Sequence, residues 1–312
     1  MILVTGGLGF IGCRLCSDLL NEGFEVVIGT SRKNASLPLE LGKAKLVRID
    51  LSNLDNLRTA CNSVYGIVHL AGLDAKSSGR NPKQALSINS IGTRLLLQAA
   101  KDASVKKFVY VSTVHVYGSP LTGTLSEDRF TKPIHPYSIS QRLAEDYVAE
   151  MAHEKSLHCT VYRLSNAVGA PVMKENNCWD LVTNDLSREV VEKNSMTIKA
   201  NSATLRDFVP MSDVTAAIKH AISGGTISGE VYNLSSGKGL SLKKLTELIV
   251  PKAIHILKRE PSVTFKNKLE NIHSSYQLDI PNNKLKSTGY LATDNLEEEI
   301  ELLMKRCQKW FV

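Results

Sequence analysis

Short runs of apolar, often β-branched residues alternate with amphipathic stretches through the first half of the chain. The apolar runs predict strands over 1–5, 24–29, 45–49, 65–71, 106–112 and 158–164. The intervening stretches predict helices near 10–21, 53–61, 82–103 and 137–154. Strands and helices that alternate in this way are typical of a parallel sheet covered by helices. The sequence therefore predicts an α/β fold built on a doubly wound parallel sheet.

The longest of these helical stretches has the clearest spacing. Between residues 85 and 100 its apolar positions recur at helical intervals, at Leu86, Ile88, Ile91, Leu95 and Leu96. A helix with such a stripe buries it, so we expect this helix to pack firmly on the sheet.

After about residue 165 the alternation becomes less regular and turns become more frequent. Two further elements are expected in this part, a strand at 229–234 and a helix at 241–250. We also expect the last helix to begin at Asp294, with Glu297 as its partner in a capping box. The chain therefore divides into a first domain, 1–165, to which a segment near 207–235 returns, and a smaller α/β region, 166–312.

Composition excludes a membrane protein. Apolar residues make up 43% of the chain, which suffices for a core, but no run of about 18 apolar residues occurs. We therefore expect no membrane partner. The first residues, MILVTGG, read as a strand that enters a glycine turn and carry no basic leader, which favours a cytoplasmic protein.

Charge and cysteines argue against two further classes of function. The net charge is +7, but basic residues are interspersed with acids and form no block with aromatics, so we expect no nucleic-acid partner. A ligand that carries a diphosphate, or simple solubility, accounts for the excess. Of six cysteines only Cys13 and Cys16 have metal-like spacing, and they fall inside a predicted helix. We expect packed thiols there and no metal site.

The strongest chemical signal is TGGLGFIG at 5–12, where a predicted strand ends and a helix begins. Gly6 and Gly9 allow a tight turn and a close approach of the backbone to a pyrophosphate. The N–H groups of the first helical turn then face the ligand at the positive end of the helix dipole. These groups belong to Phe10, Ile11 and Gly12. The motif in this context predicts a Rossmann domain that binds a dinucleotide.

The end of the second predicted strand indicates which dinucleotide is bound. NAD-selective sites have an acid there that accepts the ribose hydroxyls, whereas this strand ends in Thr30, Ser31 and Arg32. A hydroxyl and a guanidinium suit a 2′-phosphate better than a bare ribose. NADP(H) is therefore favoured as the cofactor, with NAD(H) as the alternative if Arg32 is only a solvated loop charge.

Further segments complete a known pattern. They are IVHLAG at 67–72, VSTVHVYG at 111–118, RLSNAVG at 163–169 and RDFVPMSDV at 206–214. With these motifs the chain resembles the extended short-chain dehydrogenase/reductase family, specifically its NAD(P)-dependent epimerase/dehydratase branch. That branch acts on nucleotide sugars, so the resemblance implies a nucleotide-sugar substrate without specifying the sugar.

The resemblance also implies roles for individual residues. Thr113 matches the hydroxyl that bonds the reacting sugar oxygen, and Tyr137 matches the acid/base tyrosine, because hydride transfer at a sugar carbon requires proton transfer at its oxygen. Asn166 and Arg206 match residues that hold the substrate diphosphate. Residues expected at the cofactor are Gly6, Gly9, Phe10, Ile11, Gly12, Thr30, Ser31, Arg32, Asp50, Leu51, Leu70, Ala71, Gly72 and Asn89.

The family pattern Tyr-x-x-x-Lys is broken in this chain. Gln141 stands one helical turn after Tyr137, where the family has lysine, and Arg142 points about 100° away. Gln141 keeps a hydrogen bond to the cofactor but supplies no charge that would lower the tyrosine pKa. Tyr137 should then stay protonated at neutral pH, which suits reduction of a ketone. The rival interpretation is a decayed site that only binds.

A second departure removes one activity. Sugar 4,6-dehydratases carry an Asp-Glu pair after the active-site threonine, whereas Val114 and His115 follow Thr113 here. Elimination of water then lacks its acid and base, so we reject a dehydratase of that type. His115 stays a candidate acid/base residue that faces the sugar, the alternative being a buried, hydrogen-bonded histidine.

Three functions remain open. The first is an NADP(H)-dependent reductase of a 4-keto nucleotide sugar with Tyr137 as proton donor. The second is a nucleotide-sugar 4-epimerase with a retained NAD, and the third is a non-catalytic regulator that binds a dinucleotide. The resemblance further implies a homodimer formed through the helices at 82–103 and 137–154.

Overall fold

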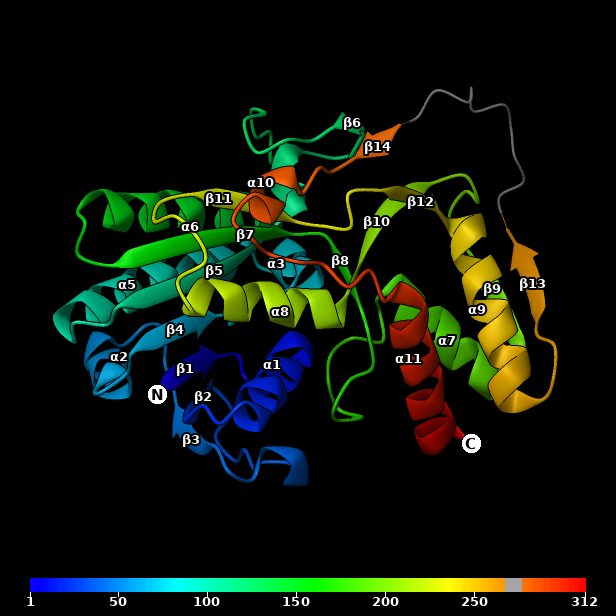
Figure 1. The fold of residues 1–312 in the computed structure, drawn as a ribbon, viewed down its shortest axis with the longest axis horizontal. Helices are drawn as coiled ribbons and strands as arrows, with labels where there is room; N and C mark the ends of the chain where they lie inside the picture. The colour runs from blue at the N-terminus through cyan, green and yellow to red at the C-terminus, as the bar shows by residue number, and fades with distance from the viewer. Residues whose placement is uncertain (267–276) are drawn as a thin grey trace.

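A seven-stranded sheet forms the centre of the computed structural model, which describes residues 1–266 and 277–312 (Figure 1). The strand order is β3-β2-β1-β4-β5-β7-β11, and every neighbouring pair is parallel. The strands are β1 (Ile2–Thr5), β2 (Val26–Thr30), β3 (Lys45–Arg48), β4 (Gly66–His69), β5 (Lys107–Thr113), β7 (His158–Leu164) and β11 (Val231–Leu234). The predicted α/β class and parallel Rossmann sheet are confirmed.

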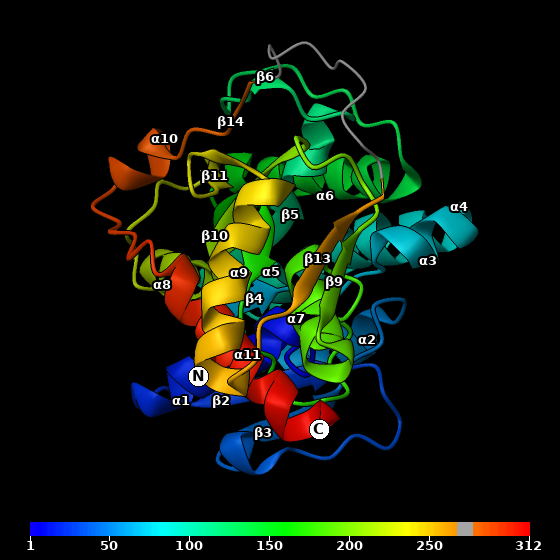
Figure 2. The same ribbon diagram turned by 90° about the vertical axis from the view of Figure 1, so that its right-hand side faces the viewer.

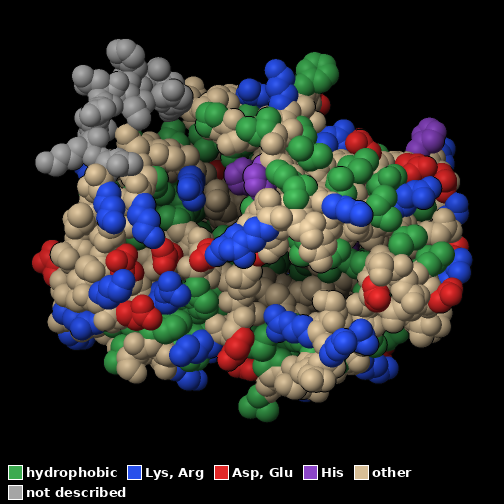
Figure 3. All heavy atoms as spheres, turned by 180° about the vertical axis from the view of Figure 1, so that it is seen from behind, with side chains coloured by type: hydrophobic (Ala, Val, Ile, Leu, Met, Phe, Trp, Pro, Cys, Tyr) green, Lys and Arg blue, Asp and Glu red, His purple; other side chains and the backbone are tan. Residues whose placement is uncertain are grey.

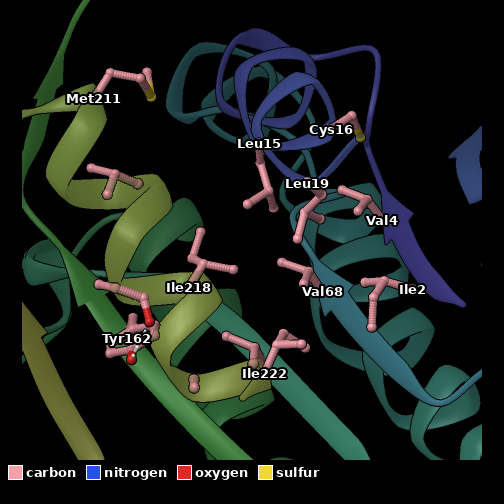
Figure 4. Close-up of a cluster of buried hydrophobic side chains, with 14 of the residues drawn as sticks. Ile2, Val4, Leu15, Cys16, Leu19, Val68, Tyr162, Met211, Ile218 and Ile222 are labelled. Carbon is pink, nitrogen blue, oxygen red and sulfur yellow. Dashed lines mark hydrogen bonds between the residues drawn. The ribbon is translucent and has the colours of Figure 1, made fainter. Parts of the chain in front are cut away.

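Helices cover both faces of this sheet. One face carries α1 (Phe10–Asn21) and α8 (Met211–Ile222), and the other carries α2 (Leu54–Cys61), α5 (Gly92–Asp102) and α6 (Pro136–His153). In Figure 4, Leu19 of α1 and Ile222 of α8 approach Val4 and Val68 of the sheet, and all four are buried. Because both faces are covered, the central strands are apolar throughout rather than alternating.

The helix expected over 82–103 is divided. It consists of α4 (Pro82–Ala85), a π-helical turn (Leu86–Ile91) and α5, and it is preceded by α3 (Ala75–Arg80), which the pattern did not predict. A π turn takes up an additional residue and so rotates the positions on either side relative to a regular helix. Leu86 and Ile91 are therefore 40% and 45% exposed, while Leu96 is buried. The predicted stripe was wrong at its first turns.

The C-terminal part has a core of its own. Helices α7 (Val182–Lys193), α9 (Leu242–Leu257) and α11 (Leu296–Phe311) pack together at one end of the molecule, as Figures 1 and 2 show. Small sheets flank them: β8 (Asn166–Val168), β10 (Leu205–Pro210) and β12 (Gly239–Ser241) form one, and β9 (Ser195–Ile198) and β13 (Ser262–Phe265) another. The remaining elements are β6 (Gly123–Thr124), its partner β14 (Leu278–Asp279), α10 (Asn283–Lys286) and two short 3-10 helices, Leu39–Leu41 and Val114–Tyr117.

The last helix begins later than predicted. Its first residue is Leu296, and the preceding Asn295 makes no side-chain cap. Asp294 has a φ of 55° and gives its N–H to a carboxylate oxygen of Asp213 at 3.1 Å. A bond to a distant carboxylate thus fixes the segment before the helix, and no capping box with Glu297 forms.

Two structural findings bear on the excluded classes. No helix of the described residues is both long and apolar enough to cross a bilayer. Cys13 and Cys16 are buried in α1, and nowhere within 1–266 and 277–312 do three or more His, Cys, Asp or Glu side chains gather as a metal site would require.

Candidate active site

A cleft of about 580 Å³ opens at the carboxyl ends of β1, β2 and β4, where the winding of the sheet reverses. Open parallel sheets bind their ligands at this position. Ten residues expected at the cofactor line the cleft: Gly6, Gly9, Thr30, Ser31, Arg32, Asp50, Leu51, Leu70, Ala71 and Gly72. Four others do not line it, namely Phe10, Ile11, Gly12 and Asn89.

The glycine turn brings backbone close to this cleft. Gly6 has a φ of +68°, and a β-carbon on it would lie 2.9 Å from a backbone nitrogen of the opposite wall. A β-carbon on Gly12 would lie 2.3 Å from the Gly6 oxygen, so Gly12 serves the close packing of α1 on the turn. Gly9 caps α1 without a side-chain acceptor, which leaves N–H groups of the first turn for an anion. The turn fits the pyrophosphate of a dinucleotide.

The β2–β3 end of the cleft is basic. Arg32 and Arg48 both line it, and Arg48 lies opposite Thr30 in the register of the two strands. The Thr30 hydroxyl accepts the Arg32 N–H at 3.2 Å, so the strand end carries a hydroxyl where an acid would select NAD. Arg48 was not expected at the cofactor; it stands near the end of the third predicted strand, and the pairing of β3 with β2 brings it to the cleft.

Asp50 is the one carboxylate among the described residues that line the cleft. Its Oδ1 accepts the N–H of Ser52 at 2.9 Å and the Ser52 hydroxyl at 2.6 Å. These hydrogen bonds lower the pKa of Asp50, so the carboxylate is charged and held at the edge of the cleft.

Tyr137 and Thr113 do not line the cleft and approach each other beside it, at the carboxyl end of β5. Tyr137 lies in the first turn of α6, and Thr113 is the last residue of β5. Burial raises the pKa of Tyr137 to about 12, while a hydrogen bond from the Thr113 side chain acts in the opposite direction and the charge of Asp74 adds to the rise. The phenol is therefore protonated at neutral pH.

The start of α6 is fixed by its own sequence. His135 caps the helix by accepting the N–H of Tyr137 at Nδ1, at 3.2 Å, and Pro136 follows at the first helical position. The Ser138 hydroxyl accepts the His135 N–H at 3.3 Å and completes a capping box. This arrangement holds the backbone that carries Tyr137.

Gln141 lies one turn further along α6 and is buried. Its Oε1 accepts the hydroxyl of Tyr110, a buried residue of β5. Its Nε2 lies toward the cleft, since a β-carbon on Gly72 would be 3.6 Å away from it. Arg142 turns elsewhere and bonds the Thr131 hydroxyl at 3.1 Å, so it brings no charge to Tyr137.

Asn89 connects the loop after β4 to α6 behind the cleft. It lies in the π-helical turn and is 1% exposed. Its Oδ1 accepts the Leu73 N–H at 2.7 Å, and its Nδ2 donates to the Ser140 hydroxyl at 2.9 Å. Asn89 therefore ties the loop after β4 to α6 next to Gln141, which accounts for its absence from the cleft lining.

The residues expected at the substrate lie on the adjoining small sheet. Asn166 of β8 donates from Nδ2 to the Asp207 carbonyl oxygen at 2.8 Å, and Arg206 of β10 precedes Asp207. Arg206 is half-buried, and burial lowers its pKa. The side chain of His115 is exposed, contrary to the buried alternative. Desolvation by the neighbouring groups lowers the pKa of His115, and the positive charge of Arg206 lowers it further. Figure 3 shows histidine side chains beside a hollow near the centre of one face.

These features define an enzyme class: a Rossmann-fold protein with a dinucleotide cleft and a Thr–Tyr pair beside it. The chain belongs to the NAD dependent epimerase/dehydratase family, whose model matches residues 2–235. It is therefore an NAD(P)-dependent enzyme of a family that modifies nucleotide sugars.

Relatives of known name share this fold. UDP-glucose 4-epimerase 4 of Oryza sativa subsp. japonica is 30% identical over 276 residues, which cover 78% of this chain and 74% of that protein. The structure of MoeE5 in complex with UDP-glucuronic acid and NAD is 25% identical, with a TM-score of 0.81 over 99% of both chains. RMD from Pseudomonas aeruginosa, complexed with NADPH, has the same fold at 23% identity, with a TM-score of 0.77 over 99% of both chains.

Proposed function

We propose that this chain is a nucleotide-sugar 4-epimerase. The observation that carries the proposal is the approach of Tyr137 to Thr113 beside the dinucleotide cleft. An alcohol carbon that gives up a hydride must also lose its hydroxyl proton, and this pair is suited to moving that proton. The rice relative is a UDP-glucose 4-epimerase by name, and the MoeE5 complex holds a UDP-sugar with NAD. These relatives favour epimerisation over the one-way reduction that the sequence departures favoured.

Tyr137 takes the proton of the sugar hydroxyl and later returns it, while Thr113 holds the sugar oxygen. NAD(P), which the glycine turn and the residues of the cleft would hold, would supply the acceptor and donor of the hydride at the sugar carbon. With a pKa near 12, Tyr137 needs a positive charge close by before it can act as a base. Gln141 supplies none, so Tyr137 holds its proton more firmly than it would beside a lysine.

Asn166, Arg206 and His115 bind the substrate. The guanidinium of Arg206 presents a planar fork that suits diphosphate oxygens, and its desolvation by partial burial strengthens a bond to an anion. Asn166 is held beside it through the Asp207 carbonyl. His115 lies two residues after Thr113, gives its backbone N–H to the Thr113 hydroxyl at 3.2 Å, and faces the sugar, where its side chain donates or accepts a hydrogen bond.

An NADPH-dependent reductase of a 4-keto nucleotide sugar is the second candidate, and two observations favour it. Arg32 and Arg48 make the β2–β3 end suitable for a 2′-phosphate. The neutral Gln141 leaves Tyr137 protonated, as a proton donor to a ketone must be. The solved RMD complex supports only the weaker point that this fold takes NADPH.

The protein acts as a homodimer through α5, α6 and the π-helical turn. Ile91 and Ile139 of this surface are 45% and 42% exposed, and a second copy would cover both. Analytical ultracentrifugation tests this; a monomer at micromolar concentration contradicts it.

The decisive experiment begins with the nucleotide released from the purified, denatured protein. The protein is then incubated with UDP-, GDP- and dTDP-hexoses without added cofactor, and the products are analysed by NMR. Interconversion of C4 epimers, lost in Tyr137→Phe, is the expected result. Consumption of a 4-keto nucleotide sugar that requires added NADPH moves the assignment to the reductase. Cofactor binding without turnover of any sugar contradicts both the epimerase and the reductase. The non-catalytic regulator that binds a dinucleotide is then the remaining assignment.

A further inference from the structure

Tyr110 and Gln141 form a buried pair under the β4–α6 end of the cleft. Tyr110 comes from β5, is 3% exposed and lies in the core between the sheet and α6. Gln141 comes from α6 and is 6% exposed. Since the Tyr110 hydroxyl donates to Oε1, the oxygen end of the amide is held toward the core.

The nitrogen end of the same amide is left for a ligand. Nε2 lies beside Gly72, which lines the dinucleotide cleft. In the described ranges, no protein acceptor takes a hydrogen bond from Nε2, whereas Oε1 is engaged. Both N–H groups therefore remain available at the wall of the cleft.

The reverse amide orientation is unfavourable. It would direct N–H groups at the phenol, and the Tyr110 proton would lose the amide oxygen and be left with Thr93, the other side-chain partner of this hydroxyl. The Thr93 hydroxyl already bonds the Asn89 carbonyl and approaches His69 Nε2, so it is a poorer acceptor than the amide oxygen. Tyr110 thus selects one of the two orientations that an isolated glutamine would adopt about equally.

We propose that Tyr110 is a positioning residue for the dinucleotide, because it holds the Gln141 amide with its N–H groups directed at the ribose hydroxyls of the bound cofactor. The neutral pair of Tyr110 and Gln141 thereby binds the cofactor at the position where the family has a lysine. The inference rests on the proposed dinucleotide-dependent function, but it concerns binding rather than turnover.

The test is a titration of cofactor affinity with matched variants. NADH and NADPH fluorescence gives Kd for the wild type, for Tyr110→Phe and for Tyr162→Phe. Tyr162 is the control because it is also buried in the sheet and loses a comparable hydrogen bond, from its hydroxyl to the Ala217 carbonyl at 2.8 Å, on the opposite face. Both variants should lower Tm by similar amounts.

Only Tyr110→Phe should raise the Kd, by about threefold to tenfold, as expected for one hydrogen bond that is made part of the time. In a Gln141→Lys background the same change should have no effect on Kd, because lysine has no amide to orient. An unchanged Kd in Tyr110→Phe, or an equal rise in both backgrounds, overturns the proposal.

Gln141→Glu provides a second measurement that leaves Tyr110 intact. It keeps the oxygen that Tyr110 bonds and removes the N–H groups, so it should raise the Kd at least as much as Tyr110→Phe. Wild-type affinity in this variant overturns the role of Nε2. A wild-type protein that binds neither dinucleotide overturns the proposed function itself, which is a distinct result.

Discussion

The two ends of the cleft differ in charge. At the β2–β3 end Arg32 and Arg48 stand where the proposed adenosine half lies, and the strand end has no acid. At the β4–α6 end no cation lies next to Tyr137, since Gln141 occupies the position of the family lysine, and the charge that acts on Tyr137 is the carboxylate of Asp74. The shared fold determines where a dinucleotide lies. The distribution of charge determines which dinucleotide is preferred and which direction of proton transfer is easier.

The largest expected effect is at the β4–α6 end, on Tyr137. Tyr137→Phe removes the only proposed proton carrier and should reduce turnover by about 10²- to 10⁴-fold, with the cofactor Kd changed by no more than about twofold. Initial rates and a fluorescence titration measure the two quantities. Tyr147→Phe, on the same helix, is the control and should keep wild-type activity. Full turnover in Tyr137→Phe would disprove the mechanism.

A second substitution tests the basic end. Removing both cations in Arg32→Ala/Arg48→Ala should weaken NADPH binding by about 10- to 100-fold, because a charge-assisted bond to phosphate is lost. NADH binding should change by less than about threefold. Equal weakening of both nucleotides would mean that these arginines act on the pyrophosphate common to both.

Restoring the family's cation at the β4–α6 end should make the two ends more alike in charge. In Gln141→Lys the ammonium favours the phenolate and so lowers the Tyr137 pKa from about 12 by roughly 1–3 units. Where Tyr137 acts as a base, activity rises with pH toward that pKa, so the rising limb of kcat/KM should move to lower pH. Gln141→Met is the control without charge. An identical profile in wild type and Gln141→Lys would contradict the prediction.

The smallest effect is expected at the substrate side. His115→Asn should raise KM for the accepted nucleotide sugar by about twofold to fivefold, as for one exposed hydrogen bond, and should change kcat by less than about twofold. The exposed His153, at the end of α6, provides the control His153→Asn. If His115→Asn instead slows turnover by about 100-fold, His115 is an acid/base group.

The parts of the site that depend on local sequence could be predicted, and those that depend on distant pairing could not. The glycine turn and the place of Gln141 on the Tyr137 face follow from spacing along one element. The bond from Tyr110 to Gln141 joins residues of β5 and α6, and nothing in the spacing of either element indicates it. Arg48 reaches the cleft only because β3 lies next to β2.

The difference between local sequence and distant contacts also explains where the predicted helices were wrong. The π-helical turn leaves the apolar content of the helix unchanged, so the periodicity of 85–100 did not reveal it. The start of α11 depends on a carboxylate contributed by Asp213, more than 80 residues earlier in the chain than Asp294.

The position of β11 has a consequence for synthesis of the chain on the ribosome. Strand β7 ends at Leu164, but the strand that covers its free edge ends at Leu234. At roughly 5–20 residues per second, the intervening stretch takes about 4–14 seconds to emerge. During that interval β7 presents an unpaired edge that other chains could pair with. The sheet of the nascent protein therefore closes at this edge only after β11 has been made.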